Sequence, residues 1–332
     1  FETLMLNLTL LKDGTECWGE NKPCWELDTP KSAERTEILQ PDNPAQLLTL
    51  QSRRLLLHRE NGKVDGFSLL GGDFFPRESA FVEQMTIWRN ATTKKNEPPV
   101  FVPCRHDAAK QFWREFPSVF CKGEGNVHQP GVVRWVEKVQ QLRFLSPKRR
   151  INFRISAVQY GDKDFFVNDS FSDSLAFQAV LLDELGYGWQ NRITEEISRC
   201  EQAASLVGHL AQDIATAAGD KNGNASAPAR SQFYFAVDQP FRQWLRSIDP
   251  EEDDMTETTA RWQGIARGIA EQLGQQMVLE AGSAALVGHR VKLDAGKKTE
   301  RRELYTAPKA YNRFRAGLYK LYPKTNDEGG TA

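Results

Sequence analysis

The sequence lacks the marks of a membrane-spanning or disulfide-stabilised protein. Its 332 residues contain no run of about 18 apolar residues, the length that a membrane helix needs. No signal peptide is recognisable. The five cysteines are an odd number at scattered positions, which argues against a disulfide framework and predicts a protein of the reducing cytoplasm. They are Cys17, Cys24, Cys104, Cys121 and Cys200.

The sequence also lacks the common catalytic motifs. It contains no GxSxG, HExxH or GxxxxGK[ST] segment. Gly71-Gly72-Asp73 indicates a turn and not a phosphate-binding loop, and no histidine has zinc-ligand spacing to the cysteines. We therefore expect no metal, no cofactor and no enzymatic activity.

The chain has little net charge. Its 43 basic and 44 acidic residues give a formal charge of −1, so no global field attracts it to nucleic acid. A nucleic-acid surface would have to be local. The 40% hydrophobic and 26% charged content are typical of a globular protein, and the length suits two domains of roughly 100–200 residues each.

The first half of the chain has the period of strands. Leu4, Leu6, Leu8 and Leu10 alternate with other residues, which predicts a strand over residues 2–10. A chain that begins within a strand is expected to be a fragment, with a tagged or processed terminus as the alternative. Helices are expected at 105–116 and 131–142, and a strand at 151–158.

The second half has the period of helices. Apolar residues spaced by three and four predict one helix over about 193–214, and a second is expected to start at Pro240. Two further stripes begin at Trp262 and Tyr311, so the pattern predicts a four-helix bundle. The expected fold is α+β, with a strand-rich mixed domain at 1–172 and the bundle at 173–332.

The clearest local signal is a β-hairpin. Residues 47–58 and 64–70 are strand-like, and Asn61-Gly62 between them is a strong hairpin-turn signal because both residues tolerate positive φ. Lys63 follows the turn, so its cation would lie near the tip, where it could contact a phosphate or a groove edge. The alternative is a lysine that only contacts water. Arg53 and Arg54 on the first strand would point to opposite faces.

A basic cluster at 143–154 could bind nucleic-acid phosphates or be a solvated linker. It contains no acidic residue and includes Arg149 and Arg150.

A second basic segment, 297–324, holds nine basic and two acidic residues. In it, Arg302, Lys309 and Arg313 could share a stripe with Lys320 that binds DNA. An ordinary solvated helix face is the alternative.

A second hairpin is expected around residues 156–168. Residues 156–160 and 165–168 flank the tetrapeptide Gly161, Asp162, Lys163 and Asp164. From the residues alone, this is as well explained by an ordinary surface turn.

Several segments together resemble one known family. LLTLQSRRLLLHRENGKVDGF, GGDFF, EQMTIWR, QFYFAVDQPFRQWL and APKAYNRFRAGLYKLYP occur in the order and spacing of CasA, the large subunit of the type I-E CRISPR surveillance complex Cascade. The resemblance covers nearly the whole chain at low identity and corresponds to roughly the last three-fifths of such a subunit.

The resemblance implies a non-catalytic subunit that recognises double-stranded target DNA. Its first hairpin would read the protospacer-adjacent motif, and the second would be a wedge that helps open the duplex. The relatives' wedge carries glutamine and asparagine, whereas this chain has Asp162, Lys163 and Asp164. Implied partners are CRISPR RNA within the complex, other Cascade subunits including the small-subunit dimer, and a helicase–nuclease. A protein-interaction scaffold with incidental basic patches, or an unrecognised hydrolase, is the alternative.

Overall fold

The structure is a computed structural model of the whole chain. The residues that it describes are 2–7, 11–12, 15–16, 26, 40–49, 51–76, 78–92, 94, 97–107, 109–122, 128–161, 167–220, 224–292 and 302–323.

The chain forms two compact units. Unit 1 comprises Phe1–His106 and Glu115–Pro147, and unit 2 comprises Asp107–Arg114 and Lys148–Ala332. The expected division between residues 172 and 173 falls inside a strand of unit 2. The segment Asp107–Arg114, which we call the strap, belongs to unit 2 although residues on both sides of it belong to unit 1.

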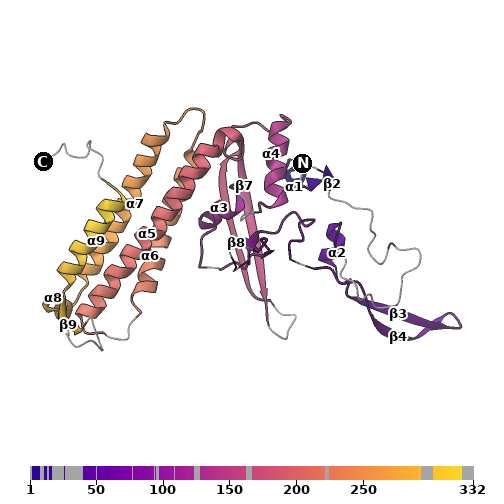
Figure 1. The fold of residues 1–332 in the computed structure, drawn as a ribbon, viewed down its shortest axis with the longest axis horizontal. Coiled ribbons are helices and arrows are strands. Elements are labelled where there is room, and N and C mark those ends of the chain that lie inside the picture. Colours follow the sequence, from indigo (N-terminus) through magenta and orange to yellow (C-terminus); the bar gives the residue numbers. More distant parts are fainter. Residues whose placement is uncertain are drawn as a thin grey trace. The chain divides into compact units, whose positions relative to one another are not determined.

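Unit 1 is built from short helices and two-stranded antiparallel sheets, β1–β2, β3–β4 and β5–β6 (Figure 1). Ala80 forms a small core with Trp88 of β5 and Phe101 of β6. The elements are α1 (Glu2–Asn7), β1 (Leu11–Lys12), β2 (Thr15–Glu16), α2 (Pro44–Leu48), β3 (Arg53–Glu60), β4 (Lys63–Gly71), β5 (Trp88–Asn90), β6 (Phe101–Pro103), α3 (Phe116–Val119) and α4 (Gly131–Gln141).

Of two strand predictions in unit 1, one is wrong and the other is wrong only at its start. The strand predicted over residues 2–10 is wrong, because residues 2–7 form helix α1, in which no side chain is buried. Residues 8–10 lie outside the described residues. The strand expected over 47–58 starts only at Arg53. Asn43 caps α2 in front of it, with its side chain accepting a hydrogen bond from the Gln46 N–H. The helix expected near 131–142 is confirmed as α4.

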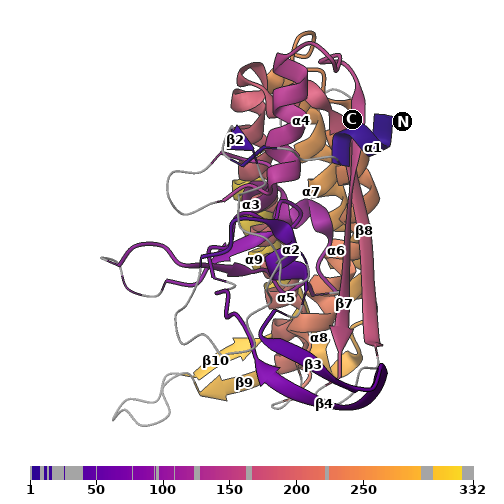
Figure 2. The same ribbon diagram turned by 90° about the vertical axis from the view of Figure 1, so that its right-hand side faces the viewer.

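Unit 2 combines a long hairpin with a helical bundle. Strands β7 and β8 pair in antiparallel register from Arg150↔Gln178 to Tyr160↔Val167. Helices α5, α6, α7 and α9 lie side by side in the bundle (Figures 1 and 2). The elements are η2 (Phe112–Glu115, whose last residue belongs to the second segment of unit 1), β7 (Arg150–Tyr160), β8 (Val167–Gln178), η3 (Ala179–Leu182), η4 (Glu184–Gly186), α5 (Tyr187–Ala217), α6 (Ser226–Ser247), α7 (Met255–Leu279), α8 (Ser283–Val287), β9 (His289–Lys292), β10 (Arg302–Tyr305) and α9 (Ala307–Leu321).

The bundle confirms the predicted α+β fold, but one helix starts earlier than expected. Pro240 lies inside α6, which begins at Ser226. An interior proline costs about 3 kcal/mol. Phe233 and Val237, both fully buried upstream of it, continue the same apolar stripe and offset that cost. Helices α7 and α9 begin after side chains that cap them. The Asp254 carboxylate accepts a hydrogen bond from the Glu257 N–H at α7, and the Thr306 hydroxyl accepts one from the Lys309 N–H at α9.

The helix predicted over 105–116 is wrong in extent. Among the described residues of that range, a 3₁₀ turn, η2, forms at 112–115, and the short α3 (Phe116–Val119) follows it. Phe112 and Trp113 of η2 are both buried. The Trp113 ring stacks on Phe241 with centroids 4.3 Å apart, and its indole N–H donates to Asp238. The strap is therefore held in unit 2 by its side chains.

Among the helices that the structure describes, none is both long and apolar enough to cross a membrane.

Candidate nucleic-acid interface

The β3–β4 hairpin has the predicted turn. Asn61 and Gly62 adopt φ of 52° and 77°, and the last paired residues are Glu60 and Lys63. A side chain at Gly62 would meet no atom within 4 Å, so only its backbone conformation favours glycine there. The turn thus sets the position of Lys63 at the first residue of β4, and Lys63 is exposed.

The two arginines of β3 point to opposite faces, as predicted. Arg54 is buried and its guanidinium lies 2.8 Å from the Asp73 carboxylate, so it holds the base of the hairpin to the chain that follows β4. Arg53 is exposed, and its guanidinium donates to the Ser52 carbonyl. Of this pair, only Arg53 presents its cation to solvent.

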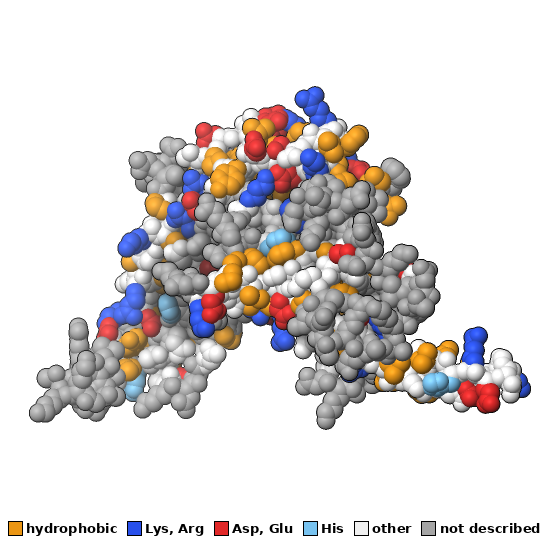
Figure 3. All heavy atoms as spheres, turned by 45° about the vertical axis from the view of Figure 1, so that its right-hand side comes forward, with side chains coloured by type: hydrophobic (Ala, Val, Ile, Leu, Met, Phe, Trp, Pro, Cys, Tyr) orange, Lys and Arg blue, Asp and Glu red, His pale blue; other side chains and the backbone are white. Residues whose placement is uncertain are grey.

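One face of the β3–β4 hairpin is apolar and exposed. Leu55 pairs with Leu69 and Leu57 pairs with Phe67 across the strands. All four side chains are about half exposed or more. Figure 3 shows hydrophobic side chains beside charged ones along this hairpin. This face was not predicted, although the run Leu55-Leu56-Leu57 carried the signal: consecutive leucines in a strand must occupy both faces.

The second predicted hairpin exists as β7–β8. Its base is anchored in unit 2, because the Arg242 guanidinium contacts Asp173 at 2.9 Å and Asp238 at 2.8 Å. Asp173 also accepts the Phe112 N–H, which ties the strap to the hairpin. At the far end of the hairpin, Gly161 is described, whereas Asp162, Lys163 and Asp164 lie outside the described residues.

The predicted basic cluster before β7 is partly matched by acids. The Lys148 ammonium lies 2.5 Å from Glu252 and within 4 Å of Asp249 and Glu251. The hydrogen bond to Glu252 raises the pKa of the Lys148 ammonium. Arg149 and Arg150 are exposed next to it. Asp249, Glu251 and Glu252, which follow α6, therefore neutralise part of the positive charge of this basic cluster.

The predicted C-terminal stripe is also partly paired. Lys309 lies 2.7 Å from Glu303, and Arg313 lies 2.9 Å from Asp213. Both cations remain about half exposed. Arg302 begins strand β10 and pairs there with Lys292.

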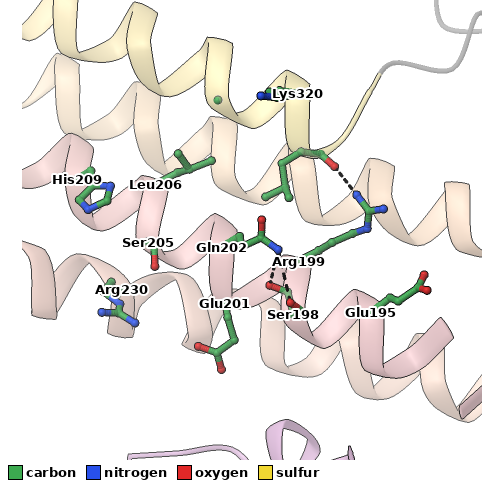
Figure 4. A pocket seen from close by; sticks show the side chains of 12 residues that line it. Glu195, Ser198, Arg199, Glu201, Gln202, Ser205, Leu206, His209, Arg230 and Lys320 are labelled. Atoms are coloured by element: carbon green, nitrogen blue, oxygen red, sulfur yellow. Dashed lines mark hydrogen bonds between the residues drawn. The ribbon is translucent and has the colours of Figure 1, made fainter. Parts of the chain in front are cut away.

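A groove in the bundle was not predicted (Figure 4). It has a volume of about 890 Å³, with α5 as its floor and α6 and α9 at its two sides. No sequence motif marks it, because its lining residues come from three different helices. They include Ser198, Gln202, Ser205, His209, Arg230 and Lys320.

The described residues contain no cluster of three or more histidine, cysteine or acidic side chains that could hold a metal ion. Cys200 is fully buried, and burial raises the pKa of its thiol. Since the thiolate is the reactive form, this cysteine is structural.

Comparison with known proteins identifies the family. The family described as "CRISPR-associated protein Cse1" matches residues 1–273. The chain belongs to the Cse1 family. A search among curated proteins found no match.

Solved Cse1 structures are similar over nearly the whole chain. Cse1 from Thermobifida fusca is 30% identical with a TM-score of 0.74, and the match covers 97% of this chain and 61% of that one. Cse1 from Acidimicrobium ferrooxidans is 20% identical with a TM-score of 0.64, covering 97% and 62%. CasA from Thermus thermophilus is 16% identical with a TM-score of 0.57, also covering 97% and 62%. The last two likenesses concern the fold alone. This Cse1 chain spans about three-fifths of the length of these relatives.

Proposed function

We propose that this Cse1 chain serves as the non-catalytic DNA-recognition subunit of a type I-E CRISPR complex. Family membership implies a Cascade subunit. Its partners would be double-stranded target DNA, CRISPR RNA within the complex, other subunits including the small-subunit dimer, and a helicase–nuclease that it helps to recruit. In such a complex, base pairing with the guide reads most of the target and protein reads a short flanking motif.

The observation that carries the proposal is the geometry of the β3–β4 turn. Two positive-φ residues make a tight two-residue connection, and an exposed lysine follows at once. A two-stranded β-ribbon fits the major groove of DNA, and a long, flexible cation at its tip can reach base edges or phosphates there. Arg53, exposed at the base of the same hairpin, would contact the phosphate backbone.

The direct test is Lys63→Ala in the assembled complex. We expect binding to a motif-bearing duplex to weaken by about 1–3 kcal/mol, as for other base-reading contacts. A duplex without the motif should be much less affected. Lys138→Ala is the matched control, because Lys138 is also an exposed lysine of unit 1 but lies on α4. Equal loss on both duplexes would make Lys63 a general phosphate contact, and no loss would leave it a solvated lysine.

The second hairpin is proposed as a wedge that starts strand separation. Its support is the rigid base: Leu175 and Phe177 are buried, and Arg242 binds Asp173. A hairpin with a fixed base can insert its far end between base pairs, at a cost of a few kcal/mol for the unstacked step. Lys163 is the cation of that end, and Asp162 and Asp164 would limit how closely it approaches phosphates.

Shortening residues 161–164 to Gly-Gly tests the wedge. Capture of a motif-bearing duplex should be unchanged, but opening of the first base pairs should slow. A target already mismatched at those pairs should restore the rate. Fluorescence of a base analogue beside the motif reports the opening. Opening at the unmodified rate would show that this segment is an ordinary turn.

The ion pairs of the C-terminal stripe favour the scaffold alternative for that surface. Lys309 and Arg313 already contact carboxylates, so they have less to offer a phosphate. Changing Arg302, Lys309 and Arg313 to glutamate should leave folding nearly intact, since exposed ion pairs contribute little. If the stripe binds DNA, the salt dependence of binding should decrease by about one unit of slope for each lost contact. An unchanged slope would mean that the stripe faces solvent or protein.

A further inference from the structure

Gly66 lies inside strand β4, where the fold gives no reason for a glycine. The chain turns at Gly62 with a positive φ, but Gly66 does not have a positive φ. A Cβ atom at Gly66 would find only the His58 ring within 4 Å among the described residues, at 3.7 Å, which is an ordinary contact. Glycine inside a strand costs about 0.5–1 kcal/mol relative to alanine. Neither the backbone nor the packing therefore accounts for this glycine.

The β-bulge beside Gly66 does not require a glycine either. The strand register shifts next to His58, which leaves Asp65 of β4 without an opposite residue on β3. A bulge favours glycine where one of its residues has a positive φ, and neither Asp65 nor Gly66 has one. A glycine in a strand that has no such reason often marks a place where a ligand or another backbone comes close.

Two polar side chains lie next to Gly66 on the same face of the hairpin. His58 is directly opposite Gly66, and its Nε2 lies 2.7 Å from the Ser68 hydroxyl oxygen. Because side chains alternate along a strand, His58, Gly66 and Ser68 share the face opposite to the exposed apolar one. Leu56, opposite Ser68, is their neighbour on the side away from the tip. Figure 3 shows a histidine at the surface of this hairpin.

The contact with Ser68 orients the His58 ring and leaves its other nitrogen accessible. A neutral imidazole has one N–H donor and one acceptor nitrogen. When the Ser68 hydroxyl donates to Nε2, the ring proton is on Nδ1. His58 is exposed, and no residue that the structure describes forms a hydrogen bond with Nδ1. This N–H can therefore donate to an oxygen of a bound molecule that lies against Gly66.

We propose that His58, Gly66 and Ser68, which we call the Gly66 patch, bind the sugar–phosphate backbone of the target duplex. The backbone lies against Gly66, and a phosphate oxygen accepts the His58 Nδ1–H. The inference rests on the proposed function, because the duplex that Lys63 reads is the ligand of the patch.

The position of the Gly66 patch along the hairpin fits the depth of a DNA groove. Strand residues advance by about 3.4 Å, so His58 lies roughly 7 Å behind Glu60, which pairs with Lys63 at the tip. The grooves of DNA are about 7.5–8.5 Å deep. When Lys63 reaches the groove floor, the Gly66 patch is therefore level with the phosphates at the groove rim.

The chemistry of the patch favours a DNA backbone over a protein partner. Neutral hydroxyl and N–H groups are common partners of DNA phosphates. The core of a protein interface is apolar instead. The exposed apolar side chains of this hairpin, among them Leu55 and Phe67, lie on the opposite face. A protein partner would therefore bind that face and not the Gly66 patch.

The test uses the assembled complex and two duplexes, one with and one without the flanking motif. Gly66→Val covers the patch but suits a strand, because β-branched residues favour strands. We expect it to weaken binding of both duplexes roughly five- to tenfold, the loss of about one hydrogen bond. The ratio of the two affinities should not change, since phosphate contacts carry no sequence information. Lys63→Ala should lower that ratio instead.

Three further variants sharpen the test. Leu55→Phe is the control, because it adds bulk to the opposite face of the same hairpin and should leave both affinities unchanged. His58→Phe keeps a ring but removes the N–H, and combined with Gly66→Val it should add little, since both remove the same contact. Asp65→Asn should tighten binding of both duplexes alike, because a carboxylate next to Gly66 repels phosphates. Hydrogen exchange of the β3 and β4 amides checks that the hairpin is intact.

Several results would overturn the proposal. They are unchanged affinities of Gly66→Val and His58→Phe with an intact hairpin, an equal loss in Leu55→Phe, or a lower affinity ratio, which would indicate a base contact. Loss of a subunit from the Gly66→Val complex would assign Gly66 to a protein contact. If the amides of Gly66→Val exchange faster, Gly66→Ala and His58→Phe decide in its place.

The Gly66 patch and the proposed function can fail independently. An unmodified complex that binds both duplexes equally would contradict motif reading by this hairpin. Weaker binding of the plain duplex by Gly66→Val would still support a backbone contact at the patch. A normal motif preference with no effect of Gly66→Val would have the opposite meaning.

Discussion

The two hairpins of this Cse1 chain are stabilised in different ways. Strand β8 of the second hairpin ends in the core of unit 2, where Phe177 is fully buried and stacks on Phe153 with centroids 5.4 Å apart. The first hairpin, β3–β4, exposes its apolar side chains, including Phe67. A two-stranded hairpin is marginal by itself in water. The first hairpin therefore depends on its turn, its strand pairing and the Arg54–Asp73 ion pair, and the second on tertiary packing.

Replacing Phe177 and replacing Phe67 should give the largest difference in the free energy of unfolding. Phe177→Ala leaves a cavity in a packed core and should lower the free energy of unfolding by about 3–5 kcal/mol. Phe67→Ala, on the exposed face, should change it by less than about 0.5 kcal/mol. Urea unfolding of the two variants measures both. Similar losses would mean that Phe67 is covered in the protein in solution.

Replacing Arg54 and replacing Arg53 should differ almost as much in their effect on the stability of the hairpin. Arg54→Ala removes the guanidinium that lies 2.8 Å from the buried Asp73 carboxylate and should cost about 3 kcal/mol. Arg53→Ala should cost less than about 0.5 kcal/mol, since its cation is exposed. Hydrogen exchange of the β3 and β4 amides is the measurement. If the two variants exchange alike, the ion pair does not hold the hairpin.

The backbone conformation of the turn should contribute less to the stability of the β3–β4 hairpin than the Arg54–Asp73 ion pair. Gly62→Ala puts a side chain at φ 77° and should destabilise the hairpin by about 1–2 kcal/mol through backbone conformation alone. Gly66→Ala, in strand β4 of the same hairpin, is the control, because the new Cβ would lie 3.7 Å from the His58 ring, an ordinary contact. Amide exchange at the hairpin separates them. Equal protection in both variants would argue against a strained turn.

The smallest expected effect is the pH dependence of the stability of unit 1. His128 stacks on Phe81 with centroids 3.6 Å apart, and burial lowers its pKa from the ordinary value of 6.5. Above that value both folded and unfolded states are neutral. As the pH falls below it, the unfolded state binds a proton first, so stability should decrease. His128→Phe should remove this part of the pH dependence of urea unfolding, whereas His58→Gln, in the exposed hairpin, should retain it.

The sequence predicts best where a single local cause is enough. Asn61-Gly62 predicts its turn because two residues determine the backbone there. The apolar stripe through Ile193, Ile197 and Cys200 predicts α5 because it repeats over many turns. The opposite directions of the Arg53 and Arg54 side chains also follow from the alternation of side chains along a strand. The sequence did not predict that Asp73 is the partner of Arg54.

The sequence predicts poorly where distant residues decide. Pro240 resembles a helix start until the packing of Phe233 and Val237 is known. The partners of Lys148, Lys309 and Arg313 are acids outside their own basic runs, so these segments looked more cationic than they are. The groove joins residues of three helices and has no linear signature. The expectation for Asp162, Lys163 and Asp164 stays a prediction.

The strap has a consequence for any attempt to divide the protein. The chain passes between the two units at 106/107, 114/115 and 147/148, so the units share three covalent connections. A single cut therefore cannot release either one. A bundle expressed from residue 148 onward would lack Trp113, whose ring packs on Phe241, and Arg114, which binds Glu201. The separated bundle would therefore have a cavity beside Phe241, where the Trp113 ring packs in the whole chain. A peptide of the strap sequence, added to the separated bundle, should bind in that cavity.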